Sequence, residues 1–274
     1  MGIVDFILNL AGLLLWLNWR SIRFDPLAKR RPATLMGTLR PAAPKKLRRW
    51  HLLVFIAALL VLRAVAYRWL VPFWVGHLDF AVTNLPFRSD DFSRMLAFSF
   101  FSFSLTLGVF YLCLLPLSLL AGPEPFHSLV QVPLGRVDDW PRWARIILPF
   151  FAAAFFWWLA SWVLGWLQIS PKTVLPAERF EQSLLIGLGS YLLWKFPLGA
   201  ILILHLVNSY VYFGKHPFWK YIHATAQSLL APLQKLPLRL GKVDFAPVLG
   251  LVLIFLVAEG IAYELLRLYT KLPF

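Results

Sequence analysis

Three ionisable side chains stand deep inside long apolar stretches of this sequence: Arg63, Lys195 and Glu259. Placing such a group in hydrocarbon costs roughly 2.5–3.5 kcal/mol, so each one needs a structural or a chemical reason. Glu259 is the only acid of the three, which makes it the natural partner of Lys195 or Arg63. The cluster supports two interpretations: a buried ion pair that fixes the register of neighbouring helices, or a group that passes protons or ions. We favour the first and keep the second as the alternative.

Other residues that could carry chemistry are few. His205 lies in the same apolar stretch as Lys195, with Asn208 and Ser209 nearby. No second histidine shares an obvious helix face with it, so we expect interhelical hydrogen bonds there, not a metal or haem site. The single cysteine, Cys113, excludes an intrachain disulfide and any multi-cysteine metal site. No glycine-rich phosphate loop, metalloprotease motif or hydrolase nucleophile motif is present. We therefore expect no cofactor and no enzymatic activity.

The segments that must position these residues are apolar and long. The chain is 59% hydrophobic and only 15% charged, whereas soluble domains are usually about half apolar and about a quarter charged. The apolar residues form blocks that match the roughly 20 residues needed to cross a bilayer. We predict an all-α membrane protein, a bundle of five or six transmembrane helices, over Ile3–Trp19, His51–Val75, Met95–Ala121, Ile146–Leu167, Leu184–Phe213 and Pro247–Leu268. The first stretch is short and contains Asp5 and Asn9, so it either spans the bilayer or lies in the interface.

Lysine and arginine are distributed unevenly between the loops. Eighteen of them lie in segments 20–50, 122–145 and 214–246, and four lie in segments 76–94 and 168–183. The positive-inside rule then places the first group in the cytoplasm and the C-terminus outside, in the cytoplasmic (inner) membrane. This bias explains the net charge of +14, so we expect no nucleic-acid partner. We expect the basic, proline-containing linker 20–50 to lie along anionic lipid headgroups.

Two loops on the basic side share the pattern Leu-Gly-(Arg or Lys)-Val-Asp-x-x-Pro, each just before an apolar stretch. Glycine permits a left-handed turn, aspartate can cap a helix, and proline is tolerated in a first helical turn. We therefore interpret each copy as an entry into a membrane helix. The shared positions are Gly135, Arg136, Asp138 and Pro141 in the first copy and Gly241, Lys242, Asp244 and Pro247 in the second.

The second copy and the residues around it, His216 to Ile261, resemble the YggT family of small bacterial membrane proteins. The likeness rests on His216-Pro217-Phe218, the proline-rich stretch Leu229–Pro237 and the loop Gly241–Pro247. Residues 95–160 are similar only through the shorter copy Gly135–Pro141. The resemblance implies a duplicated helix–loop–helix unit and a role in an envelope process, with no reaction shared by the family.

These observations divide the chain into four segments. Residues 1–50 form an apolar helix and the basic linker, residues 51–94 an additional membrane helix and an outer loop, and residues 95–168 and 184–268 two YggT-like hairpins. The hairpins are expected to be parallel repeats. Within the second, apolar residues of Phe218–Leu233 recur at helical spacing, which predicts an amphipathic helix in the membrane interface.

The function that fits this organisation is non-enzymatic. We expect a scaffold or assembly factor whose partners are the lipid bilayer and a membrane protein or a second copy of the chain. The alternative is a small transporter or channel component that uses the mid-membrane charges. A polar cavity lined by Lys195 and Glu259 and open to both faces would favour the alternative.

Overall fold

The structure is a computed structural model of the chain, and it confirms the all-α membrane fold. It describes residues 2–21, 49–70, 75–80, 83–89, 91–120, 130, 133–169, 176–211, 216–233, 239–240 and 243–271. Within these ranges six helices are long and apolar enough to cross a membrane: Gly2–Arg20, Trp50–Trp69, Phe92–Leu119, Arg142–Trp166, Pro176–Ser209 and Ala246–Lys271. The chain is therefore a multi-pass membrane protein. Four of these helices begin and end within four residues of the predicted stretches, whereas the second, predicted to reach Val75, ends at Trp69.

The chain forms two compact units. The first comprises Met1–Gly76 and Phe87–Leu107, and the second comprises His77–Pro86 and Gly108–Phe274. One long helix, α3 (Phe92–Leu119), contributes to both units, because its residues up to Leu107 pack in the first. The division between the two units thus falls inside α3.

The first unit joins α1 (Gly2–Ser21), α2 (Arg49–Leu70) and the first part of α3. Small residues bring these helices close together. A Cβ at Gly12 of α1 would lie 2.7 Å from the Phe103 ring of α3, and the Ser99 hydroxyl donates to the Leu60 carbonyl of α2 at 2.9 Å. Close packing through small and hydroxyl residues is typical of helices in lipid.

A short hairpin precedes α3. Its strands β1 (Val75–Phe80) and β2 (Thr83–Arg88) form a two-stranded sheet. Buried and exposed residues alternate along both strands, with Leu78, Leu85 and Phe87 buried, as the two-residue period of a strand requires. The predicted outer loop after the second membrane helix therefore contains regular structure.

Asp91 then caps α3, because its carboxylate accepts hydrogen bonds from the Ser93 amide and hydroxyl. These bonds lower the pKa of Asp91.

The second unit contains α5 (Arg142–Trp166) packed on α6 (Pro176–Gly189). The contact is closest at Gly187, where a Cβ would lie 2.9 Å from the Phe150 carbonyl oxygen and 3.1 Å from the Ala154 Cβ. No side chain larger than hydrogen fits there without a shift of the backbone. Gly187 therefore sets the spacing between these two helices.

The fifth span is longer and less regular than predicted. It begins at Pro176, the first residue of α6, and continues through the 3-10 helix η4 (Ser190–Trp194) into α7 (Lys195–Tyr210). The prediction of a start at Leu184 was wrong because proline at the first helical position is a good helix start. The 3-10 turn has a local cause: Pro197 has no N–H to bond the Leu193 carbonyl, and its ring crowds that carbonyl.

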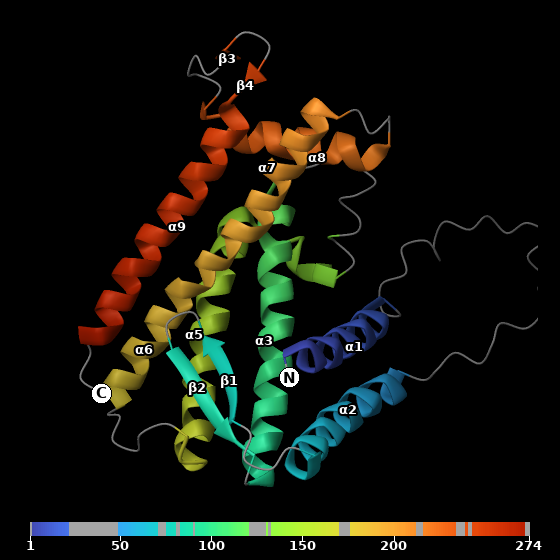
Figure 1. Cartoon of the computed structure of the whole chain (residues 1–274), viewed down its shortest axis with the longest axis vertical. Helices are drawn as coiled ribbons and strands as arrows, with labels where there is room; N and C mark the ends of the chain where they lie inside the picture. Colours follow the sequence, from blue (N-terminus) through green and yellow to red (C-terminus); the bar gives the residue numbers. More distant parts are fainter. Residues whose placement is uncertain are drawn as a thin grey trace, which may run out of the picture. The chain divides into compact units, whose positions relative to one another are not determined.

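Two further helices complete the unit (Figure 1). Helix α8 (Pro217–Leu230) lies across the end of α7, and α9 (Ala246–Lys271) runs beside α7. Helix α8 buries one face, including Tyr221, Ile222, Ala226 and Leu230, in a cluster with Ile201 and Leu202 of α7. It ends at Leu230, two residues before Pro232, because proline cannot continue a helix. Its buried face packs on other helices of the protein.

Candidate functional site

Lys195 and Glu259 meet where α7 packs on α9. The Lys195 ammonium donates to Glu259 Oε1 at 2.6 Å, and it also lies 5.5 Å from the Phe196 ring and 5.9 Å from the Phe255 ring. Gly199, one turn along α7, permits this close approach because a Cβ there would lie 2.9 Å from Phe255. Of the two partners expected for Glu259, the lysine is the one in contact with it.

The two members of this pair have different exposure. The Lys195 side chain is 16% exposed, whereas the Glu259 side chain is 67% exposed. Aromatic rings cover the ammonium, but the carboxylate projects from the surface of α9. The two charges of the pair therefore neutralise each other. The lysine is covered and well bonded, whereas the glutamate is open to its surroundings.

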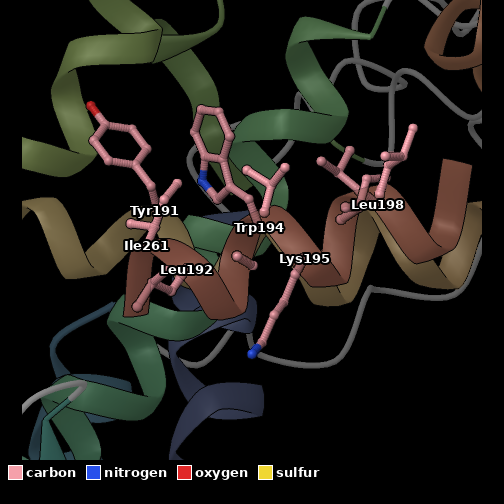
Figure 2. Close-up of a pocket in the computed structure, with 10 residues that line it drawn as sticks. Tyr191, Leu192, Trp194, Lys195, Leu198 and Ile261 are labelled. Atoms are coloured by element: carbon pink, nitrogen blue, oxygen red, sulfur yellow. The ribbon is translucent and has the colours of Figure 1, made fainter. Parts of the chain in front are cut away.

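An apolar groove of about 340 Å³ lies beside the pair, between η4–α7 and α9. Its lining consists of Tyr191, Leu192, Trp194, Lys195, Leu198, Leu253, Ile254, Val257, Ala258 and Ile261. Figure 2 shows the Tyr191 and Trp194 rings on one side of the helix and the Lys195 ammonium pointing away from them. The Tyr191 hydroxyl is bonded to the Ile146 carbonyl of α5 at 2.7 Å. Lys195 is the only charged residue of this lining, so the groove is suited to apolar side chains and not to hydrated ions.

Arg63 belongs to a separate polar network inside the first unit. Its side chain is fully buried, and its Nη2 donates to Asp5 Oδ1 at 2.6 Å. Nη1 donates to Asn9 Oδ1 at 2.8 Å, and Nη2 also reaches the Ser102 hydroxyl at 3.0 Å. The Tyr67 hydroxyl donates a short hydrogen bond to the same Asp5 oxygen. The guanidinium thus joins α1, α2 and α3 through charged and neutral partners.

Arg63 therefore has its partner, Asp5, within its own unit. The sequence contained the signal for its true partner, since Asp5 and Asn9 are four residues apart and lie on one face of α1. From the sequence, these two polar residues leave open whether the first apolar stretch spans the bilayer or lies in the interface. In the structure Asn9 and Asp5 accept hydrogen bonds from Nη1 and Nη2 of Arg63, as a buried charge requires pairing and hydrogen bonds.

The first copy of the loop motif forms a tight turn. Gly135 is buried and has φ 59°, in the left-handed region where glycine is favoured. Asp138 accepts from Arg145 Nη1 at 3.0 Å, and the same nitrogen donates to the Ser118 carbonyl at 3.0 Å. Helix α5 begins after Pro141 with no side-chain cap. Asp138 therefore holds Arg145 against the end of α3. Arg136 is exposed.

The second copy has a different local structure. Leu240 pairs with Val243, and Arg239 pairs with Asp244, in the antiparallel strands β3 (Arg239–Leu240) and β4 (Val243–Asp244). The motif residues Gly241 and Lys242 lie outside the described residues. Pro247 is buried as the second residue of α9. Position 251, which corresponds to Arg145, is leucine, so the second copy cannot form the first copy's ion pair.

We predict that Asp138→Ala will lower the unfolding free energy by about 3 kcal/mol, because it leaves the Arg145 side chain, which is only 12% exposed, without its counter-ion. The melting temperature in detergent measures this effect. Asp139→Ala, an exposed neighbour in the same turn, is the control and should change stability by less than about 0.5 kcal/mol. Equal effects of the two substitutions would contradict the role given to Asp138.

His205 has a neighbour that sequence spacing could not show. The His205 and His223 rings, from α7 and α8, have centroids 5.0 Å apart. Among the described residues no three side chains of His, Cys, Asp or Glu come together as a metal site. The two rings mark the contact between α7 and α8.

Comparison with known proteins finds no match: no family model fits the chain, and no curated protein and no solved structure is significantly similar to it. The functional interpretation therefore depends on the geometry of the molecule itself.

Proposed function

We propose that this chain is a non-enzymatic membrane scaffold or assembly factor, which binds partner membrane proteins through its helices. One observation carries the proposal: the Lys195–Glu259 ion pair, at the middle of the long apolar helix α9, lies at an exposed, apolar surface of α7 and α9. A transport pathway would require polar side chains around the charges. A binding surface requires apolar area with a few placed polar groups, and this is what surrounds Glu259.

A small transporter or channel component is the second candidate. The observation in its favour is the 3-10 turn η4, which interrupts the fifth span directly before Lys195. Interrupted helices beside charged residues are common at the binding sites of transporters. The apolar lining of the groove counts against this candidate.

We further propose that the chain is related to the YggT family and lies in the cytoplasmic membrane with its basic loops inside and its C-terminus outside. The two motif copies support the first point, since each leads into a long apolar helix, α5 or α9. The excess of lysine and arginine in alternate loops supports the orientation. In this orientation α8 lies at the cytoplasmic interface, and the linker 20–50 contacts anionic headgroups.

The experiment that separates the two candidates measures complex formation and ion flux on the same preparations. We expect partner proteins to co-purify with the full chain in mild detergent and to be lost with Glu259→Gln. Purified chain in liposomes should give no proton or cation flux above empty vesicles. Flux that disappears with Glu259→Gln would establish the transporter, and recovery of the chain alone in every detergent would contradict the scaffold.

A further inference from the structure

Glu259 is exposed at a depth where exposure is costly. It lies at the middle of the 26-residue helix α9, and 67% of its side chain is uncovered. One carboxylate oxygen accepts from Lys195. Neither lipid tails nor apolar side chains can donate to the remaining lone pairs, and an unsatisfied polar group in hydrocarbon costs several kcal/mol.

On the face of α9 that carries Glu259, four exposed residues have the spacing of a helix-packing seam. Val252, Leu256, Tyr263 and Leu266 are all exposed, and together with Glu259 they succeed one another at intervals of four, three, four and three residues. This is the 3.5-residue period with which one helix presents knobs to another. A single polar residue at the centre of such a seam fixes register and partner choice. Gly260 beside it has nothing within 4 Å of a Cβ, so a second backbone could approach closely.

We infer that the seam Val252–Leu256–Glu259–Tyr263–Leu266 binds one transmembrane helix of a partner protein that carries a neutral hydrogen-bond donor, a hydroxyl or amide, opposite Glu259. The inference rests on the proposed scaffold function and names the class of partner.

The chemistry of the pair selects the donor. Lys195 already neutralises Glu259, so a second cation would leave a net charge in the membrane, whereas a hydroxyl or amide completes the hydrogen bonds without one. A second copy of this chain fits less well. Two copies share one orientation in the membrane, and a symmetric contact through α9 would place Glu259 opposite its own equivalent, with like charges facing each other.

The test uses full-length chain in phosphatidylcholine liposomes and a synthetic polyleucine helix with one central serine, with energy transfer as the readout. We expect the serine helix to bind about tenfold more tightly than an all-leucine helix, the size of one good interhelical hydrogen bond. Glu259→Leu should abolish this difference. Glu264→Gln, an exposed acid off the seam, should preserve it. The double variant Leu256→Ala/Tyr263→Ala keeps the ion pair. It should weaken the binding of the serine helix and of the all-leucine helix to a similar extent.

Three results would overturn the inference. They are equal binding of the two helices by the wild type, Glu259-dependent dimers of the chain itself, and cysteine crosslinks from the seam to the chain's own α1 or α2 without added helix. Failure here is distinguishable from failure of the proposed function. If partners still co-purify with Glu259→Leu, the scaffold function stands and only the seam is wrong as the binding surface. Glu259-dependent ion flux, by contrast, would contradict the scaffold function itself.

Discussion

Asp5→Ala will lower the unfolding free energy by about 3–5 kcal/mol, the largest effect expected for any single substitution in the first unit. The Arg63 side chain is fully buried and bonds Asp5 at 2.6 Å, so removal of the carboxylate leaves an unpaired charge among apolar rings. Tyr67 also loses its hydrogen bond to this carboxylate. Thermal unfolding in detergent, followed by the loss of helical signal, measures the change.

A double substitution shows whether this effect comes from the uncompensated charge. Asp5→Leu/Arg63→Leu removes both partners and should recover most of the lost stability, because apolar replacements of a buried pair are often neutral. Glu264→Gln is the control, since its ion pair with Arg267 is exposed on both sides at 3.8 Å and should contribute less than about 1 kcal/mol. If the double variant is as unstable as Asp5→Ala, the contacts of the Asp5 and Arg63 side chains hold α1 in place, and the compensation of the Arg63 charge does not.

Gly187→Ala will destabilise the second unit by about 1–3 kcal/mol, since it forces atoms into a filled contact. The added methyl would lie 2.9 Å from a backbone oxygen of α5, and backbone cannot rotate away as a side chain can. Helices α5 and α6 must separate to admit it. The melting temperature and a cysteine crosslink between the two helices both report the change.

Gly260→Ala is the matched control, because a Cβ at that position meets nothing within 4 Å. Alanine is the better helix former by about 1 kcal/mol, so this variant should be unchanged or slightly more stable. Opposite signs for the two glycines are the expected result. Loss of stability at both would indicate a helix effect unrelated to the α5–α6 contact.

Most membrane helices could be predicted from the sequence because hydrocarbon imposes length and apolarity on a helix directly. The partner of Arg63 could not be predicted, because composition gives the depth of Arg63 in the membrane but not which helix lies beside it. Asp5 is visible in the sequence, but there it bears only on whether its own segment spans the bilayer. The hairpin β1–β2 was missed although Leu78, Leu85 and Phe87 show the two-residue alternation of strands.

The loop motif shows a second limit. Leu134–Pro141 and Leu240–Pro247 share most of their residues, but the first contains a 3-10 turn and the second a pair of short strands. The difference comes from residues outside the shared pattern. Arg145 bonds Asp138 in the first copy, whereas leucine stands at the corresponding position of the second. The same eight-residue pattern therefore forms different structures in different surroundings.

Alkaline carbonate extraction of membranes that contain the full chain tests the central claim most directly, because it removes peripheral proteins and leaves helices that cross the bilayer. The six apolar helices predict that all of the chain stays in the membrane pellet and is released only by detergent. Release of the chain into the carbonate supernatant would show that lipid does not surround these helices and would contradict the membrane fold.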